Sequence, residues 1–139
     1  MLLHEQSLAG SFSVDVPLRW EFVVGDPRTA VFTDPDQPDS SHGMRVIAAN
    51  ESLAKAHADL KKLDGDLVSS YRPIRTVTGI EVGGRPAFRH DFTGDGTAVE
   101  QWWVQRGKGT FRIDLFARPD LAEETQELDE RIVSTFREL

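Results

Sequence analysis

Hydrophobic and polar residues alternate over the first third of the chain, a pattern typical of β-strands with one buried face. The alternation over 12–16 ends at a proline, which cannot donate a hydrogen bond to a sheet. Runs of β-branched and aromatic residues over 20–24 and 29–33 flank a turn-rich segment and predict a hairpin. The polar, proline-containing stretch 34–43 predicts an exposed loop before a further strand over 44–49.

The spacing of apolar residues changes to that of an α-helix after Asn50. This residue is a good N-cap, and the apolar residues from Leu53 to Leu67 recur every three or four positions along one helix face. Strands are expected next, because β-branched or alternating runs are separated by short glycine-rich turns. The four predicted strands cover 74–82, 86–93, 97–106 and 110–117.

A second helix is predicted to close the chain. Asp120 and Glu123 follow Pro119 with the spacing of a capping-box variant, which is a helix-start signal. One face of this helix is then expected to pack on the sheet. It comprises Leu121, Thr125, Leu128, Ile132, Phe136 and Leu139.

The order of these elements predicts the fold class. Strands cluster instead of alternating with helices, which argues against a parallel βαβ fold. The chain is therefore expected to be α+β, with a mainly antiparallel sheet flanked by helices. Its order would be strands, a helix, a four-strand meander and a closing helix. The length of 139 residues suits one domain, so a single domain over 1–139 is expected.

The formal net charge of −7 narrows the choice of partners. Between 119 and 139, seven acidic residues stand against two arginines, so much of the excess lies on the closing helix. An acidic chain without a basic stripe cannot neutralise phosphates, so nucleic acids and anionic membranes are poor candidates and a basic protein is a better one. The alternative is that these acids only form a solvated helix face.

The absence of cysteine excludes disulfides, thiolate metal sites and cysteine nucleophiles. No apolar run approaches the length of about 18 residues that spans a membrane. His4 and Glu5 stand where a signal peptide has basic and apolar residues. A cytoplasmic location without membrane insertion is therefore expected.

A search for metal-binding and catalytic motifs yields no match. Asp34, Asp36 and Asp39 suggest a calcium loop, but Asp39 occupies the position of the required glycine and Arg45 that of the bidentate acid. The four histidines do not occur at metal-ligand spacing, and no nucleophile elbow or phosphate-binding glycine loop is present. No metal, cofactor or catalytic residue is predicted.

Turn lengths decide which residues face each other across the central hairpins. A three-residue turn over 83–85 predicts the pairs Ile80–Phe88, Thr78–His90 and Thr76–Phe92. A three-residue turn over 94–96 would set His90 opposite Glu100 and Phe88 opposite Trp102, whereas a two-residue turn would bring in Trp103. The pair of His90 and Glu100 could act as acid and base. Because no nucleophile or oxyanion donor is evident, a buried or rim ion pair is the preferred interpretation.

Trp102 and Trp103 must point to opposite faces of the sheet, because side chains alternate along a strand. Tryptophan is enriched in binding hot spots, since it offers a large apolar area and few rotatable bonds. Whichever indole is exposed is predicted to centre a partner-binding surface, unless a helix or loop covers it. The candidate residues are Arg89, Asp91, Gln101, Trp102 and Trp103.

Four short motifs occur in an order that resembles the PsbP-like superfamily. They are FSVDVPLRW at 12–20, VFTDP at 31–35, VGGRPAF at 82–88 and IVSTFR at 132–137. The superfamily includes the photosystem II extrinsic subunit, a Ran-binding nuclear import factor, and the bacterial DcrB-like and LpqN-like proteins. The resemblance implies a sheet flanked by helices and no catalytic machinery general to the family. Members mostly bind other proteins, and some DcrB-like members are similar to secretion-effector chaperones.

The resulting hypothesis is a non-catalytic, protein-binding adaptor or chaperone-like module of bacterial type, with homodimer formation left open. The alternative is a small-ligand carrier or enzyme. Its pocket would lie between the sheet and the helices and use Arg89, His90 and Glu100.

Overall fold

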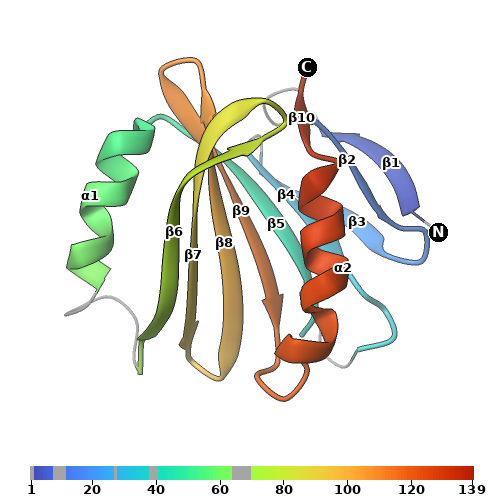
Figure 1. Ribbon diagram of the computed structural model, residues 1–139. Coiled ribbons are helices and arrows are strands. Elements are labelled where there is room, and N and C mark those ends of the chain that lie inside the picture. The colour runs from blue at the N-terminus through green and yellow to red at the C-terminus, as the bar shows by residue number, and fades with distance from the viewer. Residues whose placement is uncertain (1, 8–11, 27, 38–40, 64–69) are drawn as a thin grey trace.

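An antiparallel sheet occupies the centre of the computed structural model, which describes residues 2–7, 12–26, 28–37, 41–63 and 70–139 (Figure 1). Within these residues the sheet has seven strands in the order β3-β4-β5-β9-β8-β7-β6. Their bounds are β3 Glu21–Asp26, β4 Thr29–Thr33, β5 Gly43–Ala49, β6 Arg72–Val82, β7 Arg85–Gly94, β8 Thr97–Arg106 and β9 Gly109–Ala117. The expected four-strand meander is β6 to β9.

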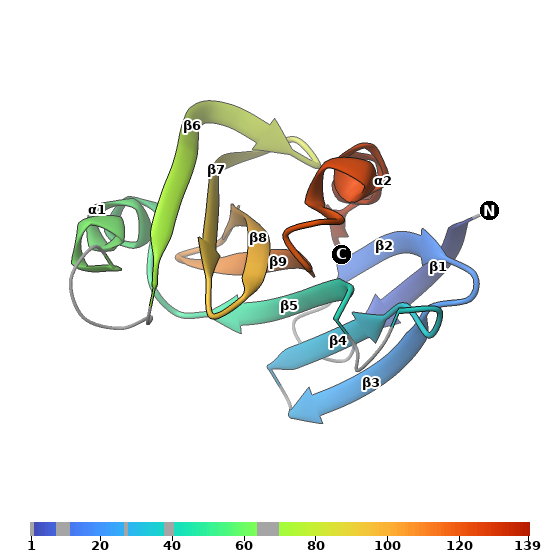
Figure 2. The same cartoon turned by 90° about the horizontal axis from the view of Figure 1, so that it is seen from below.

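The sheet curves around helix α2 and carries helix α1 on its other face (Figure 2). A small antiparallel sheet, ordered β1-β2-β10, adjoins α2. The bounds are β1 Leu2–Ser7, β2 Phe12–Pro17, α1 Leu53–Leu63, α2 Ala122–Ser134 and β10 Arg137–Glu138. The predicted α+β class with a mainly antiparallel sheet flanked by helices is confirmed. The last predicted turn of the first helix, as far as Leu67, lies outside the described residues.

The main hydrophobic core fills the space between the curved sheet, α2 and β2. Its centre is an aromatic cluster in which the Phe136 ring lies 5.2 Å from the ring of Phe12 and 5.3 Å from that of Phe111. Ile132 is also fully buried, as the helical spacing predicted, and Leu128 packs against the same core. Leu139 is 61% exposed, because the chain has left the helix and joined β2 as strand β10 by that point.

A smaller core lies between the sheet and α1. Phe88 and Trp103 of the sheet are buried there against Ala56 of α1, with Leu53 and Leu60 packed around them. The Phe88 and Trp103 rings stack with their centres 6.0 Å apart. Both faces of the sheet are therefore covered where β7, β8 and β9 lie side by side.

The hairpin turns differ from the three-residue turns that were predicted. Gly83 and Gly84 alone connect β6 to β7, since Val82 pairs with Arg85. Both glycines have positive φ, which suits tight two-residue turns. An irregularity between Val77 and Ile80 then shifts the register further. As a result Thr76 lies opposite His90 and Ile80 opposite Ala87, so the three pairs expected on this hairpin are wrong.

The β7–β8 turn is also one residue shorter than the three-residue turn over 94–96 that was one of the two predicted alternatives. Gly94 pairs with Thr97, which leaves Asp95 and Gly96 as the turn, both with positive φ. Phe88 therefore faces Trp103, and His90 faces Gln101. The alternative with a two-residue turn is confirmed.

The segment after β4 is not wholly exposed, contrary to the loop prediction. Asp34 and His42 at its ends are buried, and His42 is only 3% exposed. Asp39 lies outside the described residues. Both buried residues belong to a charge cluster with Asp129 under α2.

Candidate functional site

The five predicted partner-binding residues do not share one surface. Arg89, Asp91 and Trp102 occupy facing positions on β7 and β8 and point toward α2, whereas Gln101 and Trp103 point toward α1. Arg89 is 6% exposed and Trp103 is 8% exposed, because helices cover both faces. The two indoles point to opposite faces as predicted, and neither is fully exposed: Trp102 is half-buried.

The placement of His90 opposite Glu100, expected from a three-residue turn either as an ion pair or as an acid–base pair, is wrong. The shorter turn places the two side chains on opposite faces of the sheet. His90 instead lies between two hydroxyl groups, 2.5 Å from Tyr71 through Nε2 and 2.9 Å from Thr76 through Nδ1. A pocket that uses His90, Arg89 and Glu100 together is excluded by this arrangement.

Arg89 joins β7, β8 and α2 through its ion pairs. Its Nε donates to Asp91 at 2.9 Å, its Nη1 donates to Glu130 of α2 at 3.0 Å, and its Nη2 lies 3.4 Å from Glu100. The guanidinium also stacks over the Trp102 ring, with Cζ 5.1 Å from the ring centre. Burial lowers the pKa of Arg89, but these carboxylates outweigh it and raise the pKa, so the residue stays charged.

Glu100 lies beside Arg89 on the same face. Burial raises the pKa of Glu100 to about 7, against the opposing effects of the Arg89 charge and of a hydrogen bond from Trp102. That bond runs from Trp102 Nε1 to Glu100 Oε1 at 2.8 Å. A carboxyl group near half-protonation at neutral pH therefore lies under α2.

His42 connects the loop before β5 to α2. Its Nδ1 lies 3.3 Å from Asp34 Oδ2, and its Nε2 lies 3.7 Å from Asp129 Oδ1 of α2. Burial lowers the pKa of His42, but Asp129 and Asp34 together raise it above its ordinary value. Burial raises the pKa of Asp129, with His42 opposing the shift. Sequence reasoning missed this cluster because its members lie far apart in the chain and have no motif spacing.

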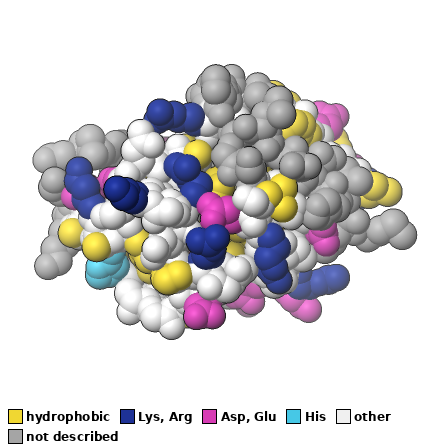
Figure 3. Space-filling model, turned by 90° about the horizontal axis from the view of Figure 1, so that it is seen from above, with side chains coloured by type: hydrophobic (Ala, Val, Ile, Leu, Met, Phe, Trp, Pro, Cys, Tyr) yellow, Lys and Arg dark blue, Asp and Glu magenta, His cyan; other side chains and the backbone are white. Residues whose placement is uncertain are grey.

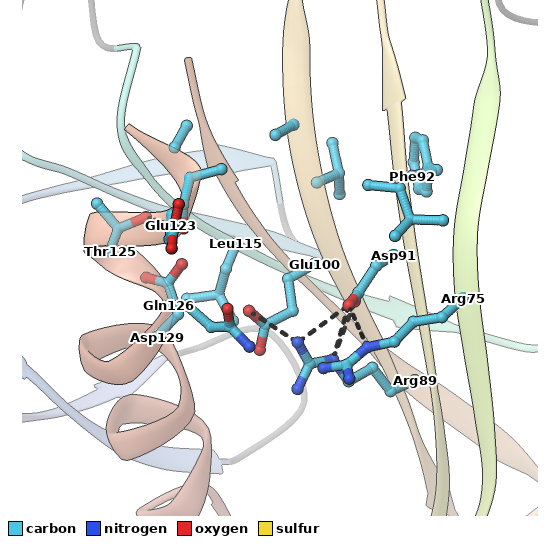
Figure 4. A pocket seen from close by; sticks show the side chains of 15 residues that line it. Arg75, Arg89, Asp91, Phe92, Glu100, Leu115, Glu123, Thr125, Gln126 and Asp129 are labelled. Atoms are coloured by element: carbon cyan, nitrogen blue, oxygen red, sulfur yellow. Dashed lines mark hydrogen bonds and ion pairs between the residues drawn. The ribbon is translucent and has the colours of Figure 1, made fainter. Parts of the chain in front are cut away.

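A groove of about 360 Å³ opens between α2 and strands β6, β7 and β8 (Figure 4). Arg89, Asp91 and Glu100 point into it from the sheet, and Arg75 extends toward Asp91 from β6 (Figure 4). The helix contributes acidic and polar side chains, which are Glu123, Thr125, Gln126 and Asp129. Carboxylates outnumber guanidinium groups around this groove.

The groove does not have the geometry of a metal site. Within the described part of the chain, no group of three or more histidine or acidic side chains is arranged to hold a metal ion. Arg89 occupies the space between Asp91, Glu100 and Glu130, and its charge takes the place that a cation would have. The carboxylates are therefore arranged around an internal cation.

Charges are distributed unevenly over the surface. At the end that carries the β6–β7 and β8–β9 turns, Lys and Arg side chains are spread widely, with acidic ones between them (Figure 3). Arg85, Lys108 and Arg137 are exposed there. The first half of α2 lies at the opposite end (Figure 1) and exposes Glu123 and Glu124.

No family model and no curated protein matches the sequence. Solved structures do match across nearly the whole chain. Cyanobacterial PsbP (CyanoP) from Synechocystis sp. PCC 6803 has a TM-score of 0.72 at 12% identity, covering 99% of this chain and 92% of that one. PA94 from Pseudomonas aeruginosa, a protein of unknown function suggested to be a regulator, has a TM-score of 0.68 at 12% identity, covering 96% and 94%.

A third match is LpqN from Mycobacterium tuberculosis, which is involved in cell envelope biogenesis. Its TM-score is 0.59 at 16% identity, covering 98% of this chain and 90% of that one. The chain has the PsbP-like fold, as the order of its motifs predicted. At these identities the likeness defines the fold alone. The expected cytoplasmic location stays a prediction.

The described part of the chain contains no helix with the length and apolar character needed to cross a membrane.

Proposed function

We propose that this protein is a non-catalytic module that binds a basic partner protein along the acidic side of α2. The observation that carries the proposal is the charge on the groove beside α2, where acidic side chains from the helix and the sheet face the same opening. Exposed glutamates extend this acidic surface along the outer face of the helix. They are Glu123, Glu124, Glu127 and Glu130.

The state of the buried titratable groups supports a non-catalytic role. Arg89 is held by three carboxylates, and His90 is held by two hydroxyl groups. His42 is buried between two carboxylates and packs edge-on against Trp20, with ring centres 5.1 Å apart. Each of these groups already has fixed partners, which is typical of structural charge clusters.

The surface charge supports a basic partner. The exposed acids on α2 attract a cationic surface over long range, whereas the turn end of the molecule carries a mixture of basic and acidic side chains (Figure 3). Such binding is expected to weaken as salt rises, since the charges involved are exposed.

Affinity capture with purified protein tests this proposal. We expect a partner to be retained by the wild type, to be released by added salt, and to be lost with the double variant Glu123→Lys and Glu127→Lys. Glu21→Lys is the matched control, because it reverses an exposed acid on β3, at the edge of the sheet farthest from β6 and the groove. The captured partner is then purified and its affinity for all three proteins is measured directly.

Equal affinity for the wild type and the α2 variant would contradict the proposed surface. Turnover of a substrate by the purified protein would contradict the non-catalytic role. Glu123 and Glu127 are exposed, so their replacement does not disturb the hydrophobic core.

A further inference from the structure

A second hollow lies on the face of the sheet that α1 covers, opposite the groove beside α2. Its volume is about 590 Å³, which is within the range of small-molecule sites. Aromatic rings from several strands and from the segment before β6 form its walls. They are Tyr71, Phe92, Trp103 and Phe116.

The floor of this hollow is a charged cluster around Asp114. This residue is 1% exposed, and its Oδ2 accepts hydrogen bonds from Arg45 Nη2 at 3.0 Å and from Arg112 Nε at 3.1 Å. Its Oδ1 accepts a bond from the Gln101 amide at 3.0 Å. Two guanidinium groups thus share one carboxylate, which leaves the cluster with a net positive charge.

Both guanidinium groups keep donors for a further ligand. Each has five N–H groups, of which Nε and one Nη face Asp114. In the described part of the chain, the side-chain hydrogen bonds of Arg45 and Arg112 run to Asp114. Their side chains are partly exposed, and both residues line the hollow. The free donors are therefore accessible from the hollow.

The aromatic wall next to these donors is held rigidly. Trp103 Nε1 donates to Gln101 Oε1 at 2.7 Å, and Gln101 in turn donates to Asp114. The indole also stacks on Phe88, and the Arg112 guanidinium lies 5.9 Å from its ring centre. A flat apolar surface and a set of cationic donors are thus fixed relative to each other before any ligand arrives, which lowers the entropic cost of binding.

Acidic residues also occur around the hollow, and they bear on the sign of the ligand charge. Asp95 is exposed, and Glu51 and Asp59 are half-buried. Water and salt screen Asp95 strongly, whereas paired hydrogen bonds to Asp114 hold the guanidinium groups of Arg45 and Arg112 in fixed positions on the floor. These fixed donors favour an anionic group at the floor, and the acidic residues around the hollow oppose it.

We propose that this hollow binds a small organic carboxylate with a planar aromatic body. The ligand carboxylate would bind the free N–H groups of Arg45 and Arg112 in the two-pronged geometry that guanidinium groups favour. The aromatic body would lie against Trp103 and Phe116. The site is on the opposite face of the sheet from the proposed protein-binding surface, so the two proposals can fail separately.

Isothermal titration with three naphthalene probes tests this site on the unmodified protein. The probes are 2-naphthoate, its neutral carboxamide and the cationic 2-naphthylmethylammonium ion. We expect 2-naphthoate to bind about tenfold more tightly than the carboxamide, since a charge-assisted bidentate contact is lost in the latter. The ammonium probe is expected to bind more weakly still.

Variants locate the bound probe. Arg45→Gln is expected to weaken 2-naphthoate binding about tenfold. Arg75→Gln is the matched control, because Arg75 also pairs with a carboxylate and is similarly exposed, but lies at the groove beside α2. The indole N–H signal of Trp103, assigned with Trp103→Phe, is expected to shift on addition of 2-naphthoate.

Several outcomes would overturn the proposal. These are equal binding of the carboxamide, tighter binding of the ammonium probe, a loss of affinity in Arg75→Gln equal to that in Arg45→Gln, and no binding at millimolar concentration. If Arg45→Gln does not fold, the probe comparison and the Trp103 signal on the wild type decide the matter by themselves.

Discussion

Trp102 and Trp103 are adjacent in the chain, yet they belong to two different cores on opposite faces of one sheet. The Trp102 indole donates to Glu100 on the α2 face, and the Trp103 indole donates to Gln101 on the α1 face. Each indole thus holds the residue two positions before it, in the cluster on its own side. This relationship allows each side of the sheet to be altered while the other serves as its control.

Replacing Trp102 with phenylalanine is expected to raise the pKa of Glu100 further. The indole N–H stabilises the charged carboxylate, so its removal favours the protonated form. The measurement is an NMR titration of the Glu100 carboxyl carbon. Trp103→Phe is the control and should leave this titration unchanged, because its indole bonds to Gln101 on the other face.

The stability of the protein is expected to fall as pH rises from about 5 to about 8. Burial raises the pKa of Glu100 to about 7 and also raises that of Asp129, and the carboxylates around His42 raise its pKa despite burial. In each case the folded protein binds the proton more tightly than the unfolded chain. The resulting stabilisation is complete below the unfolded pKa and is lost as pH rises through the folded one.

Glu100→Gln is expected to reduce this fall by about 2 kcal/mol, since it removes one of the groups responsible. The measurement is the free energy of unfolding from urea titrations across this pH range. Glu123→Gln, which alters an exposed acid of α2, should leave the profile unchanged. An identical profile for the wild type and Glu100→Gln would refute the assignment.

Truncation of Phe136 to alanine is expected to cost about 3–5 kcal/mol of the free energy of unfolding. The ring is 1% exposed and packs between Phe12 and Phe111, so its loss leaves a cavity in the main core. Leu139→Ala provides the comparison and should cost less than about 0.5 kcal/mol, because Leu139 is largely exposed. A loss below about 1 kcal/mol for Phe136→Ala would show that the segment after α2 is peripheral.

The two glycines of the β6–β7 turn are expected to tolerate alanine differently. Both have positive φ, so either substitution costs about 1 kcal/mol of backbone strain. At Gly84 an added Cβ meets open space, whereas at Gly83 it would lie 2.6 Å from the carbonyl oxygen of Phe136. Gly83→Ala should therefore lower the thermal midpoint more than Gly84→Ala. An equal decrease in the thermal midpoint for both variants would mean that the turn is not packed against the segment after α2.

The sequence by itself determined the elements of this fold, because helix and strand periodicity are local properties. The alternation over 12–16 became β2, and the apolar stripe after Asp120 became the buried face of α2. The clustering of strands and the order of four motifs were enough to predict the antiparallel sheet and the PsbP-like fold. These features depend on neighbours within a few residues, which a single sequence displays.

Only the tertiary structure decided which side chains meet. One residue of turn length moved His90 from Glu100 to Gln101, because side chains alternate along a strand and a one-residue shift exchanges the two faces. The packing of α2 buried Asp129 beside His42. The polar sequence over 34–43, which contains His42, did not indicate this burial. Coverage of the second face by α1 buried Trp103 and formed one wall of the hollow above Asp114. Such contacts join residues distant in the chain, so their chemistry follows from packing and not from local pattern.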